Sequence, residues 1–200
     1  MKKINIAITF SCFLIIASCG QKEATNGNLD SEKNAEFENL IKTIKEDKYK
    51  FFDTKSSSDE YGKSEEQEDS ERIYVELYWK DTADSGGWPA TVASINKKGI
   101  VKGDLNSDGL SDYLVPYYLN SPPGNACSFY YSIYMNNNNE YRYIGKYENG
   151  SSHYPTISLK YVKDEKIYGV WSDAFPPTDE SKPDKDVVLV LKGTTLELVK

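Results

Sequence analysis

The sequence predicts an α+β domain in which one N-terminal helix packs on a meandering antiparallel sheet of about seven to nine strands. Three observations support this fold class. One stretch near the N-terminus has the apolar spacing of a helix. After residue 72, short alternating segments rich in Tyr, Val and Ile follow one another, and the turns between them carry Gly, Asn and Pro. These short segments are closely spaced, so an antiparallel sheet or sandwich is favoured over alternating βαβ units.

The helix is expected over residues 31–48 and begins the domain, which is expected to cover residues 31–200. Phe37, Leu40, Ile41 and Ile44 are spaced as i, i+3, i+4 and i+7, which places them on one face. Acidic residues lie early in this segment and lysines late, as the helix dipole favours. The apolar face needs a partner surface, and the sheet is the simplest one.

The strands follow a region of low complexity. Residues 55–70 are rich in serine and acid, and we interpret them as a mobile acidic loop. The last two strands should meet in a tight hairpin at Gly193. Strands are predicted at residues 73–79, 88–95, 113–119, 126–135, 140–147, 156–162, 166–171, 187–192 and 195–199.

The N-terminus has the features of an export signal. Lys2 and Lys3 precede an apolar run over residues 4–16, which is too short to span a bilayer. Small residues then lead to Cys19 in the segment Ile-Ala-Ser-Cys-Gly. This segment resembles a bacterial lipobox, and the resemblance implies a signal peptide over residues 1–18 and a lipid on Cys19. The expected location is the bacterial cell envelope, with the chain held on the outer membrane by its lipid and facing the periplasm or the exterior, and residues 19–30 are expected to form a flexible tether.

Charge and cysteine usage narrow the possible partners. Removal of residues 1–18 leaves 22 basic and 31 acidic side chains, a net charge of about −9. This balance argues against nucleic acid, because binding to phosphate needs a basic face. Cys127 is the one thiol left after signal removal and lipidation, so no internal disulfide can form and a buried, unreactive thiol is expected.

The segment over residues 103–115 is the most informative motif. It carries oxygen-bearing side chains at alternate positions, a glycine where the backbone must turn sharply, and an apolar strand behind. Calcium prefers six to eight oxygen ligands, and carboxylates crowded into one loop repel each other until a divalent cation is bound. The expected ligands are the side chains of Asp104, Asn106, Asp108 and Asp112 and the carbonyl of Leu110.

This D-x-N-x-D-G-x-x-D pattern, running into a strand, resembles the calcium loop of FG-GAP and VCBS-type repeats. The resemblance implies the same five ligands. Val115 stands where an EF-hand carries its bidentate Glu, so the segment is not an EF-hand. A plain turn is the alternative, because Asp, Asn and Gly also form turns without a metal ion.

No catalytic motif stands out, and we expect a non-catalytic protein: a calcium-stabilised binding or structural module. The single histidine, His153, is expected on a loop, and a pair with Cys127 is a minor alternative. A second hypothesis is a small glycan-active hydrolase or glycan-binding accessory domain, with an aromatic sheet face as its platform. The ligand, whether glycan or protein, is not fixed by the sequence. Tyrosines on the predicted strands, which more simply line the core, are Tyr74, Tyr78, Tyr117, Tyr118, Tyr130, Tyr131, Tyr134, Tyr141, Tyr143 and Tyr147.

Overall fold

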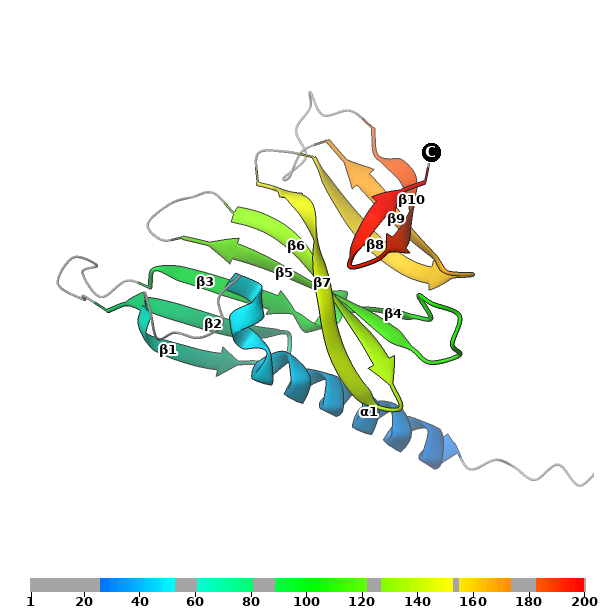
Figure 1. Ribbon diagram of the computed structural model, residues 1–200, viewed down its shortest axis with the longest axis horizontal. Coiled ribbons are helices and arrows are strands. Elements are labelled where there is room, and N and C mark those ends of the chain that lie inside the picture. Colours follow the sequence, from blue (N-terminus) through cyan, green and yellow to red (C-terminus); the bar gives the residue numbers. More distant parts are fainter. Residues whose placement is uncertain are drawn as a thin grey trace, which may run out of the picture.

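The computed structural model describes residues 26–52, 61–80, 89–121, 127–152, 155–173 and 183–199, with side chains from residue 35 onward. In these residues the chain forms one long helix and two antiparallel sheets of seven and four strands, which we name sheet A and sheet B (Figure 1). The broad α+β prediction agrees with this. No helix in the described part of the chain is long and apolar enough to cross a bilayer.

The helix α1 spans Asn26–Glu46 and is followed by a short 3-10 helix, η1, at Lys48–Phe52. It begins five residues before the predicted start, so the end of the expected tether is helical. Leu40, Ile41 and Ile44 are buried, in agreement with the helical stripe read from the sequence. The signal peptide and Cys19 lie outside the described residues.

Sheet A is antiparallel throughout and has the strand order β1-β2-β3-β5-β6-β7, with β4 also paired to β5. All of its predicted strands are present, and β1 and β4 are additional. Its strands are β1 (Tyr61–Glu68), β2 (Arg72–Trp79), β3 (Thr91–Asn96), β4 (Val101–Gly103), β5 (Asp112–Asn120), β6 (Cys127–Asn137) and β7 (Glu140–Ser151).

The strands β3 and β4 lie one after the other along the same side of β5. Between them the 3-10 helix η2 (Lys97–Gly99) interrupts the ladder, so that Val115 and Pro116 have no partner on this side. A proline inside a central strand cannot donate to the ladder. Pro116 therefore lies at a point where no strand pairs with β5 on this side.

Sheet B is a separate layer, so the prediction of a single sheet is wrong. The chain leaves sheet A near Gly150, which has a φ of +110°, and a Cβ there would lie 2.2 Å from the carbonyl oxygen of Pro155. Alternating sequence patterns do not reveal such a corner, because both sheets have the same period. Sheet B has the order β11-β10-β9-β8, made of β8 (Thr156–Lys163), β9 (Lys166–Ser172), β10 (Lys185–Lys192) and β11 (Thr195–Leu198).

Two buried clusters lie on opposite faces of sheet A. Along β5, Tyr113, Val115 and Tyr117 belong to the cluster that contains the buried residues of α1, whereas Leu114 belongs to the cluster shared with sheet B. Alternation in a strand sends neighbouring side chains to opposite faces, so β5 is buried on both sides. The second cluster consists of Val101, Leu105, Leu114, Tyr131, Ile133, Ile157, Leu159, Ile167, Leu189 and Leu196.

Two contacts join sheet B to sheet A at the outer edge of β8. The hydroxyl of Tyr131 accepts a hydrogen bond from the backbone N–H of Leu159 at 3.1 Å, and both residues are buried. Gly103 in β4 lies against Val162, and a Cβ on this glycine would fall 2.3 Å from the Cβ of Val162. The edge of sheet B is therefore covered by sheet A.

The predicted acidic loop is wrong over residues 61–68, which form β1; residues 55–60 lie outside the described chain. β1 pairs with β2 along its length, and lysines from α1 and η2 neutralise its carboxylates. A charged strand at the edge of a sheet also resists pairing with another chain. The sequence predicts a solvated loop here because Lys45 and Lys97, the lysines that pair with Glu68, lie far from it in the chain and are not visible as its partners.

Candidate functional site

Asp112 fixes the predicted calcium loop to the sheet. Its carboxylate is fully buried at the start of β5, where Oδ2 accepts from the N–H of Leu105 at 2.8 Å and Oδ1 from the N–H of Asn136 at 2.9 Å. Burial raises the pKa of Asp112, and the charges of Asp108 and Asp104 raise it further, while these two hydrogen bonds oppose the shift. The predicted ligand is thus also a structural anchor.

The other side chains of the loop bend back onto its own backbone. Asp104 accepts from the N–H of Gly109 at 2.9 Å, and Asp108 accepts from the N–H of Leu110 at 2.8 Å. Asn106 accepts from the N–H of Asp108 at 3.2 Å and donates its amide to the Asp108 carboxylate at 2.8 Å. Gly109 has a φ of +83°, as predicted for the sharp turn. These bonds hold the loop as a series of side-chain-capped turns.

The loop has the right donors for calcium, since all of them are oxygens. The carboxylates of the loop also interact, because the negative charges of Asp108 and Asp104 contribute to raising the pKa of Asp112. However, in the described residues no group of three or more Asp, Glu, His or Cys side chains is close enough to hold a metal ion. The conformation described therefore satisfies the turn without bringing the carboxylates to one point, and calcium binding stays a prediction.

A second site, not found from the sequence, is a groove of about 660 Å³ on sheet A. It lies on the face that carries Tyr131, next to the region where sheet B packs. The volume is within the range of small-molecule sites. Its lining combines aromatic rings, amides and hydroxyls with one cation. The lining residues whose contacts bear on ligand binding are Arg72, Ser94, Tyr118, Asn120, Cys127 and Phe129.

Arg72 is the cation of this groove. Its Nη1 donates to the hydroxyl of Tyr118 at 2.8 Å and to Oγ of Ser94 at 3.4 Å, and its Cζ lies 5.7 Å from the centre of the Tyr118 ring. These groups come from β2, β3 and β5, and their sequence neighbours Ile73, Ile95 and Tyr117 belong to the cluster on the other face. Strand alternation thus builds one polar row across the sheet.

The far end of the groove has aromatic and hydrogen-bonding groups. Phe129 packs edge-on against Tyr118, with 6.3 Å between the ring centres. The side-chain oxygen of Asn120 is buried and has no hydrogen-bond partner. Cys127 is half-buried, and its backbone N–H donates to Oγ of Ser152 at 3.3 Å. This end of the groove therefore holds an acceptor that a ligand could satisfy.

Most of the predicted tyrosine platform belongs to the core instead. Tyr117, Tyr134 and Tyr141 are buried in the cluster with α1, and Tyr131 is buried in the cluster with sheet B. Tyr118 reaches the groove from the opposite face of β5. The simpler reading of tyrosine as core lining is thus confirmed for these four residues.

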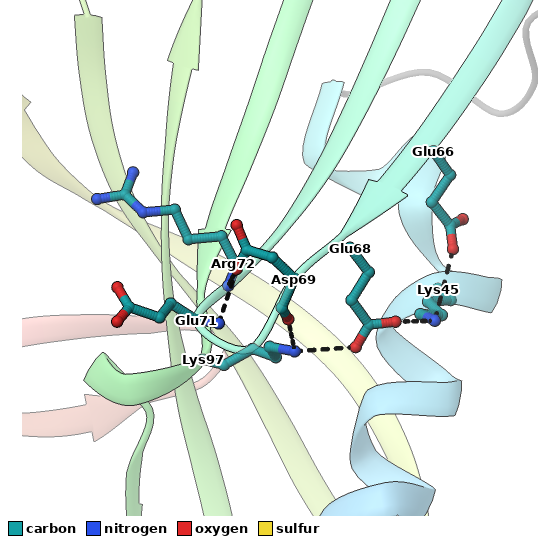
Figure 2. A network of polar contacts seen from close by, with 7 residues as sticks. All are labelled: Lys45, Glu66, Glu68, Asp69, Glu71, Arg72 and Lys97. Carbon is teal, nitrogen blue, oxygen red and sulfur yellow. Dashed lines mark hydrogen bonds and ion pairs between the residues drawn. The ribbon is translucent and has the colours of Figure 1, made fainter.

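Figure 2 shows a polar network that holds the turn preceding Arg72. Lys45 of α1 pairs with Glu68 and, at 3.7 Å, with Glu66 of β1. Lys97 of η2 pairs with Glu68 at 2.9 Å and donates to the carbonyl oxygen of Asp69. Hydrogen bonds from the two lysines lower the pKa of Glu68. The turn is therefore fixed from two other elements.

Asp69 completes this network. Its Oδ1 accepts from the N–H groups of Glu71 and Arg72, each at 2.7 Å, and these bonds lower the pKa of Asp69. These bonds thereby position the backbone of Arg72, whose side chain lines the groove. The sequence signal for this arrangement was weak: Glu66 and Glu68 share a face at a spacing of two residues, which fits a strand as well as a loop.

His153 lies outside the described residues, so the Cys127–His153 pair stays a hypothesis. Ser152, whose Oγ accepts from the backbone N–H of Cys127, is the last described residue before His153. Comparisons with protein-family models, with curated proteins and with solved structures gave no match. Function is therefore inferred from the groove and the loop themselves.

Proposed function

We propose that this protein is a lipid-anchored, non-catalytic binding module of the bacterial envelope that takes a small polar ligand in the sheet A groove. The observation that carries this proposal is the groove itself, a concave site in which one arginine, aromatic rings and side-chain amides converge. The lipobox-like segment ending at Cys19 supports the anchor and the location. The acidic net charge favours a ligand other than nucleic acid.

Binding is favoured over catalysis by the chemistry of the lining. Hydrolysis of a glycoside needs two carboxyl groups at the scissile bond. A thiol or hydroxyl nucleophile needs an adjacent base. The described lining contains neither a carboxylate nor a histidine, so Cys127, Ser94 and Ser152 have no base beside them there. This composition suits a site that holds its ligand unchanged.

The proposal can be tested by blocking the groove without a mutation. The full chain, purified in detergent, is screened on an array of glycans and small organic anions before and after a bulky maleimide is attached to Cys127. Binding should be lost on labelling, because Cys127 lines the groove. The matched control is Lys42→Cys in a Cys127→Ser background, which places the same label on the exposed surface of α1. Retained binding after labelling of Cys127 would contradict the proposal.

We also propose that calcium occupies the loop over residues 104–112 when the ion is present. The ion would be held by the side chains of Asp104, Asn106, Asp108 and Asp112 and by the carbonyl of Leu110. It would supply a structural cross-link and neutralise crowded carboxylates, and it would take no part in a reaction. The all-oxygen donor set supports this role, and Asp112 would transmit it to β6 through the N–H of Asn136.

A further inference from the structure

We propose that the groove recognises a saccharide bearing a carboxylate, a uronic acid, with Arg72 as the contact for its charge. This inference rests on the proposed binding function and specifies its ligand. The inference is supported by the absence of a carboxylate partner for Arg72, by the single charge in the described lining and by the aromatic and amide groups around it. The arrangement of the strands also makes an extended peptide a poorer ligand.

The guanidinium of Arg72 has only neutral partners in the described residues. Both of its side-chain hydrogen bonds use Nη1, so Nη2 and Nε have no partner there. The nearby lysines are different, since Lys45 and Lys97 each pair with a carboxylate. The charge of Arg72 contributes to lowering the pKa of Asp69. However, the Asp69 carboxylate accepts hydrogen bonds from backbone N–H groups and forms no ion pair with the Arg72 guanidinium. In an acidic chain, a half-buried arginine without a carboxylate is a ready site for an anion.

The number of cations limits the charge of the ligand. In the described lining Arg72 is the single charged side chain, whereas phosphate groups are usually held by several cations or by clustered backbone N–H groups. A planar carboxylate can accept from Nη2 and Nε together, which form one edge of the guanidinium. A monoanion of this shape fits the site better than a phosphate.

The other lining groups suit the body of a sugar. Tyr118 and Phe129 provide apolar ring surface, and Asn120 has a buried oxygen that needs a donor. Because the Tyr118 hydroxyl accepts from Arg72, its own proton is free to point toward a ligand oxygen. Rings for the apolar face of a sugar and polar groups for its hydroxyls are thus present together.

An extended peptide is a poorer fit to this surface. Peptides add to sheets through unpaired backbone at an edge. The groove lies mainly on the face of β2, β3, β5 and β6, which are interior strands of sheet A. Pro116, at the interruption in the pairing of β5, and Asn149 of β7 also line it. Side chains therefore supply most of the contacts available to a ligand here, which favours a compact molecule with its own hydroxyl groups.

The test compares galacturonic acid with its methyl ester, which keeps the sugar and removes its single charge. Binding of each to the full chain in detergent is measured by calorimetry. The acid should bind about tenfold or more tightly than the ester, because one charge-assisted pair is lost in the ester. Arg72→Gln should remove this difference, whereas Lys42→Gln, which removes an exposed charge from α1, should keep it.

The outcomes separate this inference from the proposed function. Equal binding of acid and ester to the unchanged chain would overturn the role of Arg72, while loss of both on labelling of Cys127 would still support a ligand groove. Absence of binding by either probe would overturn the uronic acid assignment, and the labelling screen would then decide the wider proposal. If Arg72→Gln fails to fold in a thermal melt, the comparison of acid with ester on the unchanged chain decides alone.

Discussion

Replacing Tyr131 by Phe should destabilise the protein by removing one oxygen atom. The hydroxyl of Tyr131 accepts from the N–H of Leu159, and both residues are buried. β8 is an edge strand of sheet B, so this N–H has no second strand to pair with on its outer side. Without the hydroxyl, a buried donor stays unsatisfied, which costs about 1–3 kcal/mol.

The assay is equilibrium unfolding in urea at neutral pH. With a urea dependence of about 1–3 kcal/mol per molar, a loss of about 2 kcal/mol lowers the midpoint by about 1 M. Amide exchange at Leu159 should accelerate in the same variant, because its hydrogen bond is gone. The matched control is Tyr161→Phe, which removes a hydroxyl from a side chain that is 51% exposed and should change stability by less than about 0.5 kcal/mol.

Equal stability of the two variants would refute the reasoning, because it would mean that the N–H of Leu159 does not depend on Tyr131. A loss of stability without faster exchange at Leu159 would also contradict it. That result would place the cost elsewhere in the cluster.

Three further predictions concern the loop and its surroundings. Calcium at about one hundred times its dissociation constant should stabilise the chain by about 2.7 kcal/mol; a melt with calcium and then with chelator measures this gain, and Asp104→Ala should abolish it. Gly103→Ala should destabilise by about 1–3 kcal/mol in urea, because its Cβ would overlap the Cβ of Val162, and the loss should be smaller in a Val162→Gly background, where that Cβ is absent. Burial alone would raise the pKa of Glu36, but hydrogen bonds, chiefly from Lys102, lower it overall. Because the pKa is lower in the folded than in the unfolded chain, Glu36 contributes stability that is present above the unfolded value of 4.5 and is lost as pH falls through the folded value. Glu36→Gln should therefore flatten the pH dependence of the urea midpoint below about pH 4.5.

The strands with alternating apolar residues were predictable, and the elements missed had no such pattern. The helix and the strands of residues 73–79 and 187–192 appear close to their predicted positions, since burial of one face imposes a period on the sequence. β4 was missed because it has three residues and follows an interruption. β1 was missed because its pairing depends on lysines of α1 and η2 that are remote in sequence.

The candidate sites differ in the same way. The loop over residues 104–112 is local, so its turns and its glycine could be predicted from spacing alone. The groove assembles Arg72, Ser94, Tyr118 and Phe129 from four strands. Each of these residues is unremarkable in its own segment. Only the register of the strands brings them together, and register between distant segments cannot be read from one sequence.

The charged edge of sheet A has a consequence for how copies of this protein behave when crowded. β1 pairs with β2 on one side, and the described residues place no strand on its other side. An approaching strand of another molecule would have to strip water from Lys63, Glu65 and Glu66 to dock there. The same acidic run that resembles a solvated loop should therefore keep this edge from pairing with a second copy of the chain at concentrations where an uncharged edge would polymerise.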